Sequence, residues 1–245
     1  MPTSDVKLCE LRTSNGSFMV PYEVHRRKGM RHLRVLVDDS NRVQLKVPYR
    51  ISEADALKFL RSQGEWVVKT LERTPRRITL HEHLVKQKTV SARGRDIPLE
   101  MGFRARELSF LLHDEPERVE IALDPQLEIE RQLRLVLQAF AREVVPERVK
   151  ALAKEHDLRV KRVTIRDQRT RWGACTDRST LSLNWRLVLL TAALQDHVIL
   201  HELAHLKHLD HSKKFWNLLR ELDPACDRHD RALTKVSRAL MQMGR

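Results

Sequence analysis

The sequence predicts an α+β fold with a β-rich N-terminal half and a largely helical C-terminal half. Short runs of alternating apolar and polar residues dominate up to about residue 124, whereas patterns of helical period dominate beyond it. The composition shifts at Asp124-Pro125, so we divide the chain into 1–124, a β-rich region of unknown role, and 125–245, a second domain. With 245 residues and 41% hydrophobic content, the chain can build a sizeable core without disulfides.

The N-terminal region is expected to begin with a small antiparallel sheet. Its strands are predicted by three alternating runs: Phe18–Val24, His32–Val37 and Val43–Val47. Ser52 followed by Asp55 is typical of a capping box, and the apolar pattern behind it predicts one helix that continues to Leu71 across Gly64. Strand-like runs return between residues 89 and 123 and complete the β-rich half.

The second domain is expected to alternate helices with a few strands. Residues 127–152 have a strong helical pattern, in which Pro146 predicts a kink or a break. Strands are expected at 160–165 and 180–183, with Asn184 capping the segment that follows. A helix from about residue 194 to 208 and another that begins at Ser212 complete the domain.

Charge and cysteine content indicate which partners and which cellular compartment to expect. The formal net charge of +13 favours an acidic partner, and nucleic acid bound through a basic surface is one candidate. The basic residues occur in short separate runs, however, and aromatic residues make up only 5% of the chain, which favours solvated basic faces. Three widely spaced cysteines, no apolar signal segment and no long apolar stretch predict a cytoplasmic protein without a membrane span.

A cluster of histidines indicates a metal site. Five of the twelve histidines lie between residues 197 and 211, and His201-Glu202-Leu203-Ala204-His205 matches the H-E-x-x-H pattern of zinc peptidases. Four residues of an α-helix advance about 400°, so His201 and His205 lie on one face and can bind the same ion. Glu202 lies about 100° further round, where its carboxylate can reach a water on that ion. The apolar residues around the motif predict a buried helix.

A catalytic zinc usually takes three protein ligands and one water, so a third ligand is needed. His208 lies about 10.5 Å along the helix axis from His201, which is too far while the helix continues. His211 lies beyond the expected end of the helix, where the chain can turn back, and is the favoured third ligand. Glu221 and Asp223, in and after the following helix, are the acidic alternatives.

Other histidines and a cysteine that could bind metal are interpreted instead as ordinary structural or surface residues. His197 lies one turn before His201 without a glutamate after it, so we interpret it as a partly exposed helix residue. His81 and His83 suit one face of a strand and are interpreted as a solvated pair. Cys175 is interpreted as a small buried hydrophobic residue, because a fourth protein ligand would close a catalytic zinc site.

Three segments resemble a known family, the YgjP-like metallopeptidases, which are relatives of the SprT and WLM zinc-protease groups. The segments are Arg171-Trp172-Gly173-Ala174-Cys175, Leu183-Asn184-Trp185-Arg186-Leu187, and the run from His201 through His211 to Trp216. The resemblance implies a zincin-like C-terminal metallopeptidase domain. It also implies that His201, His205 and His211 bind Zn²⁺ and that Glu202 is the catalytic base.

Two positions depart from the pattern of that family. Ala174 stands where the family usually has Ser, and Asp210 stands where Asn usually precedes the third ligand. Neither change removes a ligand, and Asp210 offers a carboxylate that could orient a ligand imidazole.

The predicted function is hydrolysis of peptide bonds in a peptide or protein substrate. Zn²⁺ would activate a water, Glu202 would take its proton, and a cleft side chain such as Arg171 would stabilise the developing oxyanion. Two alternatives remain: a metal-dependent nucleotide phosphohydrolase, and a SprT-like protease or binding protein associated with nucleic acid.

Overall fold

A computed structural model describes residues 7–38, 41–73 and 78–244 of the chain. The chain forms two compact units, Met1–Arg77 and Ile78–Arg245. The division that we expected at residues 124 and 125 therefore lies inside the second unit, because the strands before residue 124 pack against the helix that follows them. The α+β prediction and the β-rich N-terminal half are confirmed.

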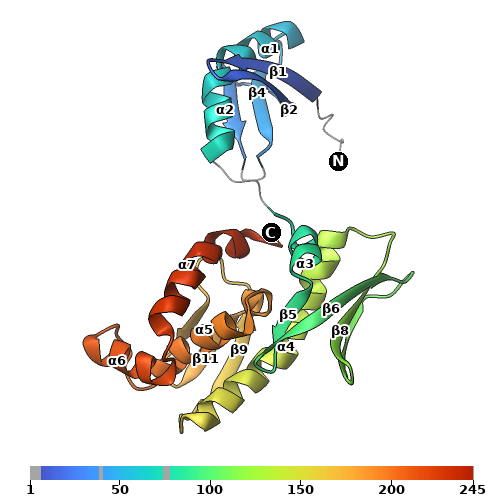
Figure 1. The fold of residues 1–245 in the computed structure, drawn as a ribbon. Coiled ribbons are helices and arrows are strands. Elements are labelled where there is room, and N and C mark those ends of the chain that lie inside the picture. The colour runs from blue at the N-terminus through green and yellow to red at the C-terminus, as the bar shows by residue number, and fades with distance from the viewer. Residues whose placement is uncertain (1–6, 39–40, 74–77, 245) are drawn as a thin grey trace. The chain divides into compact units, whose positions relative to one another are not determined.

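The first unit packs two helices on a four-stranded sheet (Figure 1). Its strands are β1 (Lys7–Thr13), β2 (Gly16–Arg27), β3 (Arg34–Val37) and β4 (Val43–Pro48), in the order β1-β2-β4-β3. The sheet is mixed rather than antiparallel, since β2 pairs with β4 in parallel. Alternation within a strand shows which face is buried but carries no information about the direction of its partner. That is why the sequence prediction of the pairing was wrong.

The helix that follows is divided in two. Ser52 caps α1 (Glu53–Ser62) by accepting the backbone N–H of Asp55 at 3.1 Å, as expected. The helix ends at Ser62 with Gln63 as its C-cap residue, and α2 (Gly64–Arg73) begins directly after it, so the single continuous helix that we predicted is wrong. Gly64 packs against β1, where an added Cβ would lie 3.4 Å from the carbonyl oxygen of Arg12, at ordinary van der Waals distance.

The second unit begins with α3 (Leu80–Gln87) and a second mixed sheet. Its strands are β5 (Thr89–Ala92), β6 (Arg95–Phe103), β7 (Ser109–Asp114) and β8 (Glu117–Leu123), in the order β5-β6-β8-β7. His81 and His83 lie on α3, so their expected placement on a strand is wrong. The long helix α4 (Ile129–Glu155) runs through Pro146 without a break and packs along this sheet (Figure 1).

The C-terminal part of the second unit carries the predicted site. A three-stranded sheet has the order β10-β11-β9, formed by β9 (Arg162–Arg166), β10 (Gly173–Cys175) and β11 (Thr180–Asn184). The short helix η1 (Trp185–Leu189) follows, capped by Asn184 as expected. Three helices complete the unit: α5 (Ala192–Ala204), α6 (Lys213–Leu222) and α7 (Cys226–Gln242). No described helix is long and apolar enough to cross a membrane.

Candidate metal centre

Helix α5 holds the H-E-x-x-H motif at its C-terminal end. The helix is apolar and almost entirely buried, and it packs against α4, α6, α7 and β10. It ends at Ala204, four residues before the expected end at His208, and His205 is its C-cap residue. The early end lets the chain turn back, so that His211 approaches the helix from the loop before α6.

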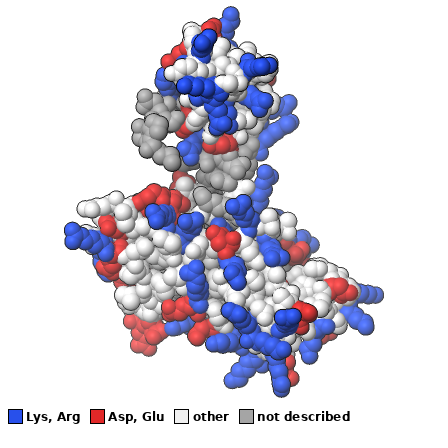
Figure 2. Space-filling model, turned by 180° about the vertical axis from the view of Figure 1, so that it is seen from behind, with Lys and Arg blue, Asp and Glu red and all other residues white. Residues whose placement is uncertain are grey.

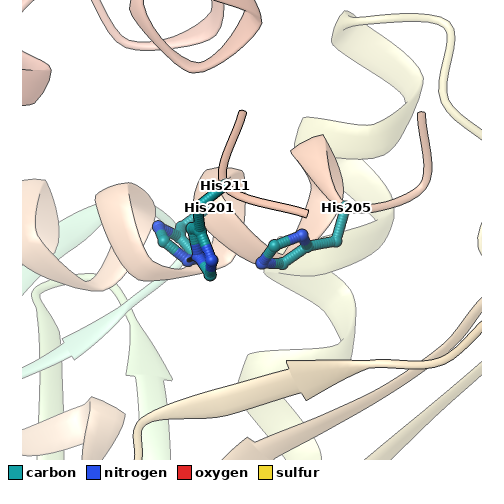
Figure 3. Close-up of side chains that lie close together, drawn as sticks. All are labelled: His201, His205 and His211. Carbon is teal, nitrogen blue, oxygen red and sulfur yellow. Dashed lines mark hydrogen bonds between the residues drawn. The ribbon is translucent and has the colours of Figure 1, made fainter. Parts of the chain in front are cut away.

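The three predicted ligands converge at this helix end. His201, His205 and His211 each offer one ligand atom, and these atoms all lie within 4.8 Å of one another. Figure 3 shows the three imidazoles gathered at the end of α5. The Nε2 atoms of His201 and His211 are 3.1 Å apart, which is near the spacing of about 3.3 Å between two ligands of a tetrahedral zinc ion.

The surroundings of the imidazoles keep them in the form that binds metal. Nδ1 of His205 donates to the backbone carbonyl of His208 at 2.9 Å, which leaves its Nε2 lone pair available. Burial lowers the pKa of His201 to about 3, and the neighbouring histidines act in the same direction. Burial also lowers the pKa of His205. These imidazoles are therefore neutral at physiological pH, as metal ligation requires.

Phe215 of α6 supports all three imidazoles from one side. Its ring is fully buried and stacks on His205 with centroids 4.5 Å apart and planes inclined by 28°. It meets His201 and His211 edge-on at 5.0 and 4.7 Å. A rigid aromatic surface of this kind restricts the rotamers of the three histidines and so organises the group before an ion binds.

Glu202 lies in a closely fitted position beside this group. Glu202 is only 6% exposed, and its Oε2 atom is buried without a hydrogen-bond partner. Burial raises the pKa of Glu202 to about 7, although Arg171 opposes the rise. A Cβ on Gly173 would lie 2.6 Å from both Cγ and Oε1 of Glu202, so the carboxylate occupies space that only a glycine in β10 leaves open.

A pocket of about 290 Å³ opens between α5, β10 and α7. Glu202 and His201 lie at one side of it, and Trp172 is held in its wall by a 2.8 Å hydrogen bond from Nε1 to Ser237. The full set of lining residues is Arg171, Trp172, Gly173, His197, Val198, His201, Glu202, Asp230 and Leu233. The site therefore combines neutral imidazoles, a buried carboxylate and an adjoining partly apolar pocket, which is the arrangement of a metal-assisted hydrolase.

The family model of the YgjP-like metallopeptidase domain matches residues 31–236. The chain belongs to this family. It is therefore a metal-dependent peptidase, whose substrate is a peptide or protein. The crystal structure of the metallopeptidase zymogen of Pyrococcus abyssi abylysin is similar to part of the chain, with 23% identity and a TM-score of 0.35. That match covers 38% of this chain and 96% of the other. The comparison with curated proteins found no match.

In this YgjP-like protein, several residues near the site have other surroundings than the sequence analysis predicted. His197 is 2% exposed rather than partly exposed, and it bonds to Asp223 at 2.7 Å. Asp223 therefore belongs to a different group of side chains from His201, and Glu221 is exposed on α6. Neither acidic alternative to His211 is part of the His201 group. The Oδ1 atom of Asp210 accepts the backbone N–H of Ser212 at 3.3 Å.

Cys175 of this YgjP-like protein is half-buried at the end of β10 and is not part of the histidine group. Burial, together with the nearby charge of Glu202, raises the pKa of its thiol to about 11. The thiol is therefore protonated at neutral pH in the metal-free protein.

The raised pKa of Glu202 predicts a pH-dependent stability of the metal-free protein. Its carboxyl has an ordinary pKa of 4.5 when unfolded and about 7 when folded. As pH rises between these values the unfolded state loses its proton first, so the free energy of unfolding falls, by about 3 kcal/mol in total. Urea unfolding in EDTA at pH 5 and pH 8, with the wild type compared with a variant that lacks this carboxyl, isolates this contribution.

Glu202→Gln provides the comparison for that experiment, because it keeps the other titrating groups. His201, with a lowered pKa, changes stability in the opposite direction, but it does so in both proteins. The variant should gain stability relative to the wild type on going from pH 5 to pH 8. An equal pH dependence in the two proteins would show that Glu202 does not titrate in this range.

Proposed function

We propose that this YgjP-like protein is a zinc peptidase in which His201, His205 and His211 bind Zn²⁺ and Glu202 is the general base. The observation that carries the proposal is the convergence of three imidazole nitrogens within 4.8 Å, beside a buried carboxylate oxygen that has no hydrogen-bond partner. Neutral imidazoles are borderline-soft ligands that suit zinc better than the hard ions Ca²⁺ and Mg²⁺. Three of them leave one coordination position for water or substrate.

The chemistry divides between the ion and the side chains. When bound, Zn²⁺ would supply Lewis acidity that polarises a carbonyl and lowers the pKa of a water toward about 7. Glu202 would accept the proton of that water, and its own pKa near 7 suits a group that both takes and returns a proton. The same carboxyl would then donate the proton to the leaving amine. The fixed contact with Gly173 restricts where this carboxylate can move during the two transfers.

Substrate would lie across the mouth of the pocket between α5 and α7. Trp172, Val198 and Leu233 provide apolar walls that suit an uncharged side chain. Arg171 is exposed at the same pocket and close enough to Glu202 to affect its pKa, so its guanidinium is the available donor for a developing oxyanion.

A cleavage profile against a peptide library, measured with and without a zinc chelator, tests the proposed function. The expected result is cleavage that the chelator abolishes and added Zn²⁺ restores. Phosphate release from nucleotides, measured in parallel, distinguishes the phosphohydrolase alternative. Chelator-sensitive phosphate release without peptide cleavage would overturn the proposal.

Association with nucleic acid receives less support from the surface. On the face drawn in Figure 2, Lys and Arg side chains occur on both units and are interspersed with acidic and uncharged residues. Such a distribution contributes solubility and weak, salt-sensitive attraction rather than a defined binding surface.

A further inference from the structure

A second group of potential ligands lies outside the proposed catalytic centre. His197 of α5, Asp223 at the end of α6 and His229 of α7 offer three ligand atoms that all lie within 4.8 Å of one another. We propose that these three residues form a second metal site, which takes a divalent first-row transition ion such as Zn²⁺. The ligand atoms would be Nδ1 of each histidine and Oδ2 of the aspartate. This inference does not depend on the proposed peptidase chemistry.

The carboxylate of Asp223 is already oriented for this task. Its Oδ1 atom accepts the backbone N–H of Ala225 at 3.0 Å, which fixes the plane of the group. Its Oδ2 atom faces Nδ1 of His197 at 2.7 Å and Nδ1 of His229 at 2.9 Å. Two imidazoles from different helices thus converge with the same nitrogen on one oxygen. Their ring centroids are 5.7 Å apart, and their planes are inclined by 65°.

The negative charge of Asp223 is unfavourable in a buried position unless nearby groups compensate it. The residues His197 and Asp223 are 2% and 6% exposed, so the carboxylate is shielded from water. An ionised carboxylate in such surroundings needs compensating partners, and a divalent ion held between the three ligand atoms would supply positive charge directly at Oδ2. The side chain of His229 is 15% exposed, which leaves one side of the group open to an entering ion and to water as a further ligand.

The hydrogen-bond distances also indicate how the second site differs from the first. Ligands of a tetrahedral zinc ion lie about 3.3 Å apart, so each N···O contact must lengthen by about 0.5 Å to admit the ion. Each neutral imidazole then carries its proton on Nε2 and offers its Nδ1 lone pair. In the His201 group, by contrast, the Nε2 atoms of His201 and His211 are already 3.1 Å apart. The second site is therefore the weaker of the two.

Equilibrium dialysis of the full chain against Zn²⁺, followed by metal analysis, tests the second site. The wild type should bind two ions per chain at saturation. His229→Gln should bind one, because it removes a ligand at a partly exposed position. His211→Gln should also bind one, held by the second group, and the double variant should bind none. His156→Gln, at the end of α4 and outside both groups, is the matched control and should bind two.

Two results would overturn the second site. If the wild type and His229→Gln both bind one ion, the three residues form only a hydrogen-bonded network. If both bind two, the second ion lies elsewhere. Anomalous zinc scattering from crystals of the wild type answers the same question without a substitution, through the presence or absence of a peak among His197, Asp223 and His229. Because His211→Gln removes a ligand of the proposed catalytic centre, an ion retained by that variant separates this inference from the proposed function.

Discussion

Glu202→Gln is expected to keep the zinc of the proposed catalytic centre and to lose peptide hydrolysis by a factor of about 10²–10⁴. The amide has nearly the shape of the carboxylate but cannot accept the proton of the attacking water, and general-base catalysis is typically worth a factor of this size. Zinc content and kcat for a cleaved peptide are the two measurements. Binding of substrate should change little, because the apolar walls of the pocket come from Trp172, Val198 and Leu233, which the substitution leaves in place.

Glu221→Gln is the matched control, since it makes the same chemical change at an exposed position of α6. It should leave both zinc content and kcat unchanged. Full activity in Glu202→Gln would remove Glu202 as the base. Loss of zinc in that variant would indicate instead that the carboxylate holds the ion.

Gly173→Ala should displace Glu202 and reduce activity although it touches no proposed ligand. The added Cβ would lie 2.6 Å from Cγ of Glu202, so the Glu202 side chain must move aside, or β10 or α5 must shift. Overpacking of this kind typically costs about 1–3 kcal/mol of stability, and a displaced general base loses the alignment that proton transfer needs. We expect kcat to fall by at least about tenfold. Chemical denaturation should show the loss of stability.

Gly102→Ala is the control for that experiment. Gly102 lies in β6, and a methyl group added there would have no other atom within 4 Å, so the same substitution meets open space. It should have little effect on stability or kcat. Wild-type activity and stability in Gly173→Ala would show that the close fit between β10 and Glu202 is not needed.

The candidate site was largely predictable from the sequence because its geometry is local. His201 and His205 are joined by one helical turn, and the convergence of His211 required only that the helix end soon after the motif. The relation of Glu202 to Gly173 was not predictable, since β10 and α5 are far apart in the sequence and only the tertiary packing brings them together. The same reason explains the misinterpretation of His197, whose partners Asp223 and His229 follow it by 26 and 32 positions.

The fold was predictable at the level of elements rather than of their pairing. Alternating runs located β2, β3 and β4, and Ser52 located the start of α1. The parallel pairing of β2 with β4 depends on contacts between segments that are distant in sequence. The boundary at residues 77 and 78 likewise reflects the packing of β5–β8 with α4, which composition does not reveal.

The zinc content of the purified wild type, compared with that of His201→Ala, tests the central claim most directly. After exchange into zinc-free buffer, the wild type should retain at least one ion per chain, and the variant should retain one fewer. Peptide cleavage should be lost together with that ion. A folded, metal-free wild type that cleaves peptides equally well in the presence of a chelator would contradict the account.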